Sequence, residues 1–350
     1  MGFEPDLSHR CYGPAMATLE AALDAAAERT AFSGVVRVNR SGATELEKAY
    51  GLADRAHGIP NTVDTRFMLA SVAKGFTALA VMSLVADGTL QLSTTARSML
   101  GDDLPLIADD VTVEHLLAHR SGIGDYIDED DLDDINSYTL PVPVHRLDTT
   151  ERFLEVLDGF PTVSRADERF SYNNAGYVVL ALIAERVSGV GYHELVRGRV
   201  TKPAGLADTG FGRTDELQGD HAIAYLHAAG LRSNALHLPV LGTGDGGISS
   251  TADDLAAFWR ALYGGRIVPA ELVAEMTRPR SEWPEEDRRY GLGFHLHRTS
   301  EAVWLEGYDA GVSVCTTHDP ASGITHSVIA NWSDGAWPML SVLDEHLGTA

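Results

Sequence analysis

The chain has 350 residues, of which 50 are acidic and 27 basic, so its formal charge is −23 at pH 7 with neutral histidines. This excess of negative charge argues against nucleic-acid or anionic-membrane partners, which require basic patches. Hydrophobic residues make up 44% of the chain, as in ordinary globular proteins, and no run of about 20 apolar residues predicts a membrane span. We therefore expect a small-molecule partner, no nucleic acid and no membrane; the sequence predicts no oligomeric state.

The first residues show no apolar signal core, so a cytoplasmic protein is expected. Only two cysteines occur, Cys11 and Cys315, far apart in the chain. Two cysteines do not make a disulfide framework, and we expect two free thiols.

The chain opens with an alanine-rich pattern over residues 15–29 that predicts a helix. Residues 32–38 and 44–50 then read as two strands around an Asn-Arg-Ser-Gly turn, which predicts a hairpin.

The next segment carries the pattern Ser-x-x-Lys at Ser71 and Lys74, and Lys74 is one of only three lysines. In a helix these two residues lie one turn apart on one face, within side-chain reach. Lys74 could then accept the proton that Ser71 must lose to attack a carbonyl. Chance alone supplies such a match in roughly one chain of five with this composition. The structural alternative is a lysine at a helix start whose side chain extends to solvent.

Residues 72–85 leave almost no polar face, which predicts a helix buried on all sides, and Gly88 is a candidate left-handed residue at its end. Ser71 would lie at the start of this helix, where backbone N–H groups are unpaired and the dipole is positive. The Ser71 N–H could therefore stabilise negative charge on a carbonyl oxygen.

A Tyr-x-Asn pattern, Tyr172 and Asn174, precedes an apolar helix pattern over residues 175–187. A tyrosine beside an ammonium group can relay protons, and an asparagine offers a donor and an acceptor to a substrate. A core tyrosine with an asparagine helix cap is the structural alternative.

Other patterns between residues 89 and 265 suggest sites less strongly. His115 and His119 lie at i, i+4 but lack a zinc-protease pattern, so no metal is expected. The acidic run 125–134 lacks the glycine and glutamate of a calcium loop and is expected to be solvated. The glycine run 242–247 lacks a nucleotide-binding context, and residues 250–253 predict a helix N-terminus with a capping box.

The last third of the chain predicts strands and a final helix. The expected strands are residues 290–298, 302–305, 312–318 and 324–331, and the helix is 336–347. We therefore predict an α+β fold in which both chain ends build one antiparallel sheet flanked by helices. Residues 1–88 and 266–350 would form the sheet domain, residues 89–265 a mostly helical domain, and the active site would lie at their junction.

Six stretches in chain order resemble the serine β-lactamase and penicillin-binding-protein superfamily, in the branch with class C β-lactamases, D-Ala-D-Ala carboxypeptidases and family VIII esterases. They are residues 67–92, 111–122, 172–174, 202–210, 246–255 and 290–294. The resemblance runs from about residue 32 to the C-terminus. It implies the β-lactamase/transpeptidase-like fold, with Ser71, Lys74 and Tyr172 as catalytic residues and Asn174 contacting substrate. It does not fix the substrate, because this fold hosts several chemistries.

The third motif of that superfamily, Lys-Thr-Gly or His-x-Gly beside the nucleophile, is altered. The best match begins at Tyr308, which takes the place of the lysine or histidine. Ala310 then takes the place of the glycine, and Gly311 would present the second oxyanion N–H. In another register Glu306 fills the first position. A neutral tyrosine there favours an ester or amide without a carboxylate.

We therefore predict a serine hydrolase that works through an acyl-enzyme without a cofactor, most simply a β-lactamase-like esterase. A D-amino-acid peptidase or amidase, a β-lactamase and a transacylase are alternatives on the same machinery. A non-catalytic acyl-binding or sensor protein is the alternative of another class. The loops at residues 124–150 and 222–245 are expected to set specificity.

Overall fold

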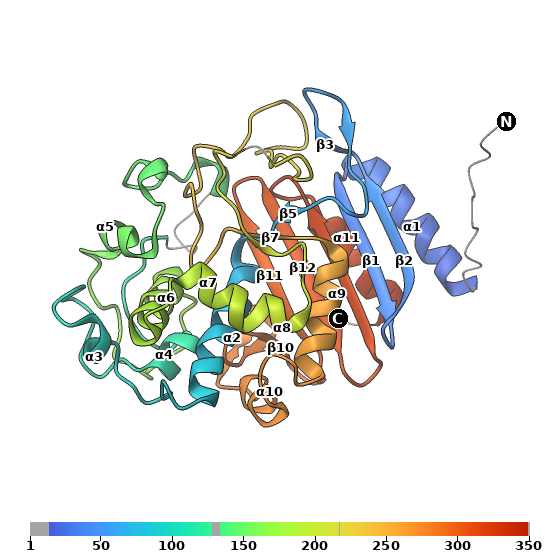
Figure 1. The fold of residues 1–350 in the computed structure, drawn as a ribbon. Helices are drawn as coiled ribbons and strands as arrows, with labels where there is room; N and C mark the ends of the chain where they lie inside the picture. Colours follow the sequence, from blue (N-terminus) through green and yellow to red (C-terminus); the bar gives the residue numbers. More distant parts are fainter. Residues whose placement is uncertain (1–13, 128–133, 217, 349–350) are drawn as a thin grey trace.

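The computed structural model describes residues 14–127, 134–216 and 218–348, and its centre is an eight-stranded antiparallel sheet (Figure 1). The strand order is β2-β1-β13-β12-β11-β10-β9-β8. The strands are β1 (Gly34–Arg40), β2 (Ala43–Tyr50), β8 (Ser281–Trp283), β9 (Arg288–Tyr290), β10 (His295–His297), β11 (Val303–Asp309), β12 (Val312–Asp319) and β13 (Ile324–Ala330). Strand β1 from the N-terminal part pairs with β13 from the C-terminal part, which confirms the predicted α+β fold.

Helices cover both faces of this sheet, because its central strands are apolar on both sides. On one face lie α1 (Pro14–Thr30) and α11 (Ala336–Leu347), in a cluster that includes Val36 and Val38 of β1. Val35, which precedes Val36, belongs to the larger cluster on the opposite face, as the two-residue repeat of a strand requires. That face carries α2 (Ala73–Ala86) and α9 (Ala252–Tyr263).

The remaining elements form the region around α2 and the loops that border the sheet. The helices are α3 (Ala96–Leu100), α4 (Val113–Leu117), α5 (Leu154–Leu157), α6 (Asn174–Ser188), α7 (Tyr192–Val196), α8 (Lys202–Ala204) and α10 (Ala270–Met276). The short turns are η1 (Ala70–Val72), η3 (Ile135–Ser137), η4 (Val144–Arg146), η5 (Thr150–Phe153), η6 (Arg197–Thr201) and η7 (Pro284–Glu286). The minor strands are β3 (Leu52–Asp54), β4 (Ile59–Pro60), β5 (Phe67–Met68), β6 (Gly210–Phe211) and β7 (Ile248–Ser250).

In the described part of the chain, no helix alone has the length and apolar composition to cross a membrane. Only the bent pair Asn174–Ser188 and Tyr192–Ala204 would meet that test together.

The predicted division at residues 88 and 265 stays a prediction, and one apolar cluster extends across it. This cluster contains Val35 and Val314 from the sheet and Leu116 and Leu180 from the helical region. Helix α2 packs on α6, and α9 packs on β1 and β13. The two predicted parts therefore share a continuous core.

Several predicted elements differ in detail from the structure. The strand expected at residues 302–305 is β11, which continues to Asp309. The single strand expected at residues 290–298 is divided into β9 and β10, because Gly293 has a φ of +89° and turns the chain between them. Helix α9 begins one residue later than the predicted capping box implies, since Thr251 is the N-cap and accepts from the Asp254 N–H.

Candidate active site

Ser71 is held in a tight turn between a short strand and a buried helix. Strand β5 pairs with β7, and the Leu69 N–H donates to the Ile248 carbonyl at 2.9 Å. Ala70 then has a φ of +45°, an unusual backbone angle for a residue with a side chain. The turn leads through η1 into α2, so Ser71 lies at the helix start and is only partly buried. The predicted buried helix is confirmed, and Gly88 after it has a φ of +78°.

Lys74 contacts three oxygen atoms in a buried position. Its Nζ lies 2.8 Å from Ser71 Oγ, 2.7 Å from Asn174 Oδ1 and 3.1 Å from the Asp245 carbonyl oxygen. Only 1% of the residue is exposed. A neutral amine has two N–H groups and one lone pair. In the structure Lys74 Nζ donates to all three oxygen atoms; as a neutral amine it would give its two N–H groups to the two carbonyl oxygens and turn its lone pair to the Ser71 hydroxyl.

Tyr172 lies beside this pair within a group of aromatic rings. The centre of its ring is 5.0 Å from Lys74 Nζ, 4.4 Å from the His119 ring and 6.1 Å from the Trp283 ring. The structure therefore brings Ser71, Lys74, Tyr172 and Asn174 together at the start of α2 and α6, as the sequence predicts.

Two histidines pack around Tyr172 in a neutral state. Burial lowers the pKa of both His119 and His295 well below 6.5, and the positive charge of Lys74 acts in the same direction. His119 Nδ1 accepts from the Asn173 N–H at 3.0 Å, so this ring helps to place the Tyr-x-Asn segment. His115 instead accepts from the Thr112 N–H at the start of α4. Within the described ranges no three metal-binding side chains group together.

Asp125 fixes the start of the helix that carries Asn174. Its carboxylate accepts from the backbone N–H groups of Asn174 and Ala175, where the helix dipole favours negative charge. Burial raises the pKa of Asp125 to about 7, although these N–H groups oppose the rise. Residues 128–133 of the predicted acidic loop lie outside the described residues.

The structure corrects the predicted register of the third motif. Gly311 lies in the β11–β12 turn, and its N–H donates to Ser333 Oγ at 2.9 Å. Ala310 lies in the same turn, with its N–H bound to Asp309 and its carbonyl oxygen accepting from Asn234. Neither N–H is therefore directed at Ser71.

Gly307 is the residue that the nucleophile turn approaches closely. A Cβ atom there would lie 2.2 Å from the Leu69 carbonyl oxygen and 3.1 Å from Ala70 Cβ, so only glycine fits. Leu305 and Glu306 then occupy the first two positions of the motif, close to the alternative register considered from sequence. The assignment of Ala310 and Gly311 was wrong because the closing turn of the hairpin was mistaken for the strand before it. Neither register places a lysine or histidine at the first position.

The backbone of Tyr308 faces Ser71 in this register. Asp309 and Val312 close the two-residue β-turn, so Asp309 and Gly307 exchange hydrogen bonds with β12 and Tyr308 between them does not. The Tyr308 N–H therefore points away from β12, on the side where β11 contacts the η1 turn. Its side chain is partly exposed, and the hydroxyl donates to Asp334 at 3.1 Å.

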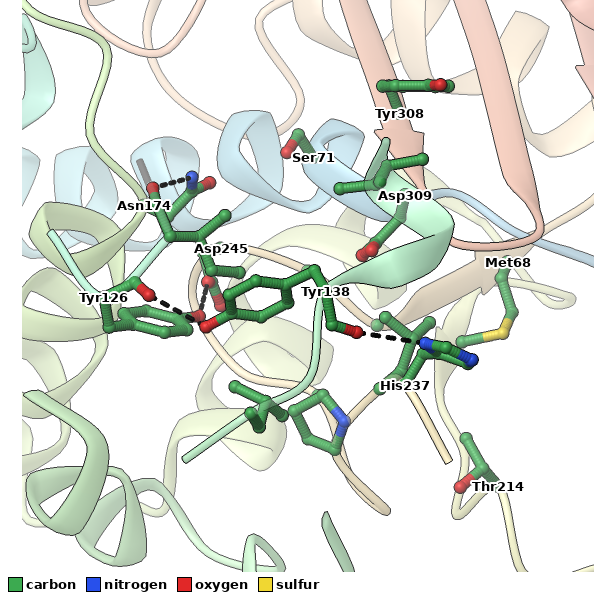
Figure 2. Close-up of a pocket in the computed structure, with 18 residues that line it drawn as sticks. Met68, Ser71, Tyr126, Tyr138, Asn174, Thr214, His237, Asp245, Tyr308 and Asp309 are labelled. Atoms are coloured by element: carbon green, nitrogen blue, oxygen red, sulfur yellow. Dashed lines mark hydrogen bonds between the residues drawn. The ribbon is translucent and has the colours of Figure 1, made fainter. Parts of the chain in front are cut away.

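Two hollows meet at Ser71 and Tyr308, which line both of them. Figure 2 shows the first, with Ser71 between Asn174 and Tyr308. We call it the apolar pocket; its walls include Met68, Tyr126, Ile135, Tyr138, Leu140 and Leu238. The second we call the aromatic hollow; its walls include Tyr172, Trp283, Arg288, His295, Glu306 and Trp337. Loops from both segments predicted to set specificity line the apolar pocket.

Sequence reasoning missed Asp245, which lies under Lys74. Its side chain is buried and accepts from the Tyr126 hydroxyl, and burial raises its pKa while Lys74 opposes the rise. The glycine run 242–247 was the available signal. A Cβ atom at Gly244 would lie 2.0 Å from the Tyr177 carbonyl oxygen, and one at Gly242 would lie 2.3 Å from that of Gly246. Such close approach of backbone to backbone explains the glycines without a nucleotide.

The comparisons with known proteins agree with this geometry. The family model described as Beta-lactamase matches residues 19–345. The chain belongs to the beta-lactamase family. A solved structure of a penicillin-binding protein from Bacillus halodurans superposes with a TM-score of 0.86 and 32% identity, covering 92% of this chain and 99% of that one.

The curated relatives include one protein named as a penicillin-binding protein and one named as an esterase. PbpX of Bacillus subtilis strain 168, named as a penicillin-binding protein, is 30% identical over 267 residues, which are 76% of this chain and 62% of PbpX. Esterase EstB of Burkholderia gladioli is 35% identical over 202 residues, which are 56% of this chain and 51% of EstB. The chain thus spans between about half and two thirds of the curated relatives that it matches.

Proposed function

We propose that this protein is a serine hydrolase that cleaves an ester or amide through an acyl-enzyme, most simply as an esterase. The contact of 2.8 Å between Ser71 Oγ and Lys74 Nζ carries this proposal. The pair lies at the meeting point of two hollows, which gives an electrophilic carbon access to the hydroxyl. The name of the relative EstB supports esterase activity.

The first half of the reaction forms the acyl-enzyme. Ser71 Oγ attacks the carbonyl carbon while its proton passes to the Lys74 amine, and the carbonyl oxygen becomes an oxyanion. The N–H groups of Ser71 and Tyr308 stabilise that oxygen. The bond to the leaving group then breaks, and the departing oxygen or nitrogen takes up a proton through Tyr172. Asn174 holds Lys74 and lines the acyl side of the site.

The second half reverses these roles with a new nucleophile. Water, or another alcohol or amine, loses a proton to the same basic groups and attacks the acyl carbonyl. The Ser71 oxygen leaves and recovers its proton. The pocket shown in Figure 2 is lined by apolar side chains and also by the acids Asp245 and Asp309, so it disfavours an anionic acyl group.

A fluorophosphonate probe tests the proposal directly. The probe should label the native protein stoichiometrically and should not label Ser71→Ala, whose only change is the lost hydroxyl. Ser121→Ala, at a buried serine of the His-x-Ser-Gly segment, serves as the matched control and should still be labelled. A folded native protein that resists the probe would support a non-catalytic acyl-binding role instead.

A substrate panel separates the remaining hydrolase classes. We expect p-nitrophenyl esters of short acyl chains to turn over faster than nitrocefin or D-alanyl amides, because neither register of the third motif supplies a cation for a substrate carboxylate. Fast nitrocefin turnover would mean a β-lactamase, and fast release from D-alanyl amides would mean a D-amino-acid amidase. Product formed only with an added alcohol or amine would indicate a transacylase.

A further inference from the structure

The aromatic hollow has a composition unlike that of the apolar pocket. Four of its residues present aromatic rings: Tyr172, Trp283, Tyr308 and Trp337. The rings of Tyr172 and Trp283 are stacked with centres 6.1 Å apart, and those of Tyr308 and Trp337 lie 5.9 Å apart. The faces of such rings carry negative charge density and attract cations.

The charged groups of the hollow leave a net negative charge. Glu286 and Glu306 both line it, and Arg288 is the one basic residue among the described residues in its walls. Arg288 is already bound by both acids, at 2.8 Å to Glu286 and 3.4 Å to Glu306. With both acids ionised these three groups carry a net charge of −1, although burial raises the pKa of Glu306. The Arg288 guanidinium already lies 5.1 Å from the centre of the Trp283 ring, so the rings of Tyr308 and Trp337 are the ones left to face a further cation.

His295 offers a further polar atom without a partner. The residue is 94% buried, since its exposed fraction is 6%, and it lines the hollow. Its Nδ1 atom has no hydrogen-bond partner among the described residues. With the proton on Nε2, this atom of the neutral ring is an acceptor with partial negative charge, which favours a cation nearby even where the cation, like choline, has no N–H to donate.

The position of Tyr172 indicates which part of a substrate enters this hollow. Tyr172 lines the aromatic hollow, and Asn174 lines the apolar pocket. Ser71 lies at the boundary, so a substrate bound to it has one part on each side. If Tyr172 delivers the proton to the departing atom, the leaving group lies in the aromatic hollow and the acyl group in the apolar pocket.

We propose that the aromatic hollow is a subsite for a positively charged amino group on the leaving group of the substrate. The substrate class is then an ester or amide whose alcohol or amine part carries an ammonium group near the scissile bond. This inference rests on the proposed function, because it uses the proton transfer by Tyr172 to assign the two sides.

Two esters of the same shape and different charge test the subsite. Butyrylcholine and 3,3-dimethylbutyl butyrate share an acyl group and differ in the alcohol part by one positive charge. We expect the kcat/KM for the choline ester to be higher by about tenfold, because the cation gains from the rings and the carboxylates. Equal values, or a preference for the neutral ester or for a carboxylate-bearing ester, would overturn the inference and leave a Ser71-dependent esterase in place.

Substitution of the acids identifies the source of the preference. Glu306→Gln should lower the ratio of the two kcat/KM values several-fold. Glu286→Gln is the second variant, at a more exposed acid, should Glu306→Gln not fold. Glu271→Gln removes the same charge from the exposed surface of α10 and should leave the ratio unchanged. A ratio that stays the same in both hollow variants would contradict the proposal.

Binding without turnover gives an independent result. In Ser71→Ala, calorimetry should show choline binding about tenfold more tightly than 3,3-dimethylbutan-1-ol, which has the same shape without the charge. Equal affinities would reject the cation subsite whatever the reaction of the native protein.

Discussion

At the scale of single residues, the site depends on backbone contacts as well as on side-chain partners. Lys74 is oriented by a carbonyl oxygen of the glycine run, and Gly307 lets β11 approach the turn before Ser71. The sequence predicted Ser71, Lys74, Tyr172 and Asn174 because their types and spacing carry the chemistry. It did not reveal whether Gly307 or Gly311 faces the nucleophile, because that depends on where the β11–β12 hairpin closes.

Gly307→Ala tests the corrected register. The added Cβ would overlap the Leu69 carbonyl oxygen, so β11 must move away from the nucleophile turn. We expect a fall of about 10²-fold in kcat/KM for p-nitrophenyl butyrate and a loss of about 1–3 kcal/mol in the free energy of unfolding.

Gly198→Ala is the control for this prediction, because a Cβ atom there meets no other atom within 4 Å. It should leave turnover unchanged. Native turnover in Gly307→Ala would show that β11 does not supply the oxyanion N–H at Tyr308.

At the scale of secondary-structure elements, the long helices and the long strands of the central sheet follow from local patterns, whereas the short elements do not. Helices α1, α2, α6 and α11 lie where periodicity and capping residues predict them, within one or two residues. Strand β8, the turn η7 and the minor strands β3 to β7 were not predicted, because elements of two or three residues carry too little pattern. The contact between α6 and Asp125, in the loop after α4, also escaped prediction. A carboxylate 49 residues from its partner gives no local sequence signal.

Asp125→Asn tests that link through the pH dependence of stability. The pKa of Asp125 is raised from 3.8 to about 7 in the folded protein, so between these values the folded state holds a proton that the unfolded state has lost. Folding is then favoured at low pH, and this contribution is lost as the pH rises toward 7. Relative to Asp125→Asn, the native protein should lose up to about 4 kcal/mol of unfolding free energy from pH 4 to pH 8.

Urea unfolding at each pH unit measures this difference. Asp158→Asn, at an exposed acid after α5, should run parallel to the native protein over the whole range. A native stability that rises with pH relative to Asp125→Asn would mean that the hydrogen bonds from α6 outweigh burial and lower the pKa instead.

At the scale of the whole molecule, the continuous core argues for cooperative unfolding. All five tryptophans lie between residues 259 and 337, so their fluorescence reports on the sheet and α9. Far-ultraviolet circular dichroism also reports on α2 and α6. We expect the two signals to give one coincident transition in urea, because apolar contacts connect these parts without a break.

Leu180→Ala sharpens this test, since Leu180 is a fully buried residue of α6. It should lower the free energy of unfolding by about 2–5 kcal/mol in both signals alike. Separate midpoints, or a shift in the dichroism curve alone, would show that the helical region unfolds as an independent domain, as the sequence-based division implies.

The sequence predicted the family fold, and with it a sheet built from both ends of the chain, because ordered motifs extend over nearly the whole chain. The domain boundary and the cytoplasmic location stay predictions. The residues that line the apolar pocket and the aromatic hollow could not be predicted from local sequence patterns, because both are assembled from strands, loops and a helix that meet only after folding.

The placement of Ser71 on the wall between two compartments has a kinetic consequence. After the first product departs, the compartment that it vacates is the route by which the next nucleophile arrives, by microscopic reversibility. Water and a retained or added amino alcohol would therefore compete for the same space. The partition of the acylated intermediate between breakdown and exchange would then vary with the concentration of that alcohol, even though the chemical groups at work stay the same.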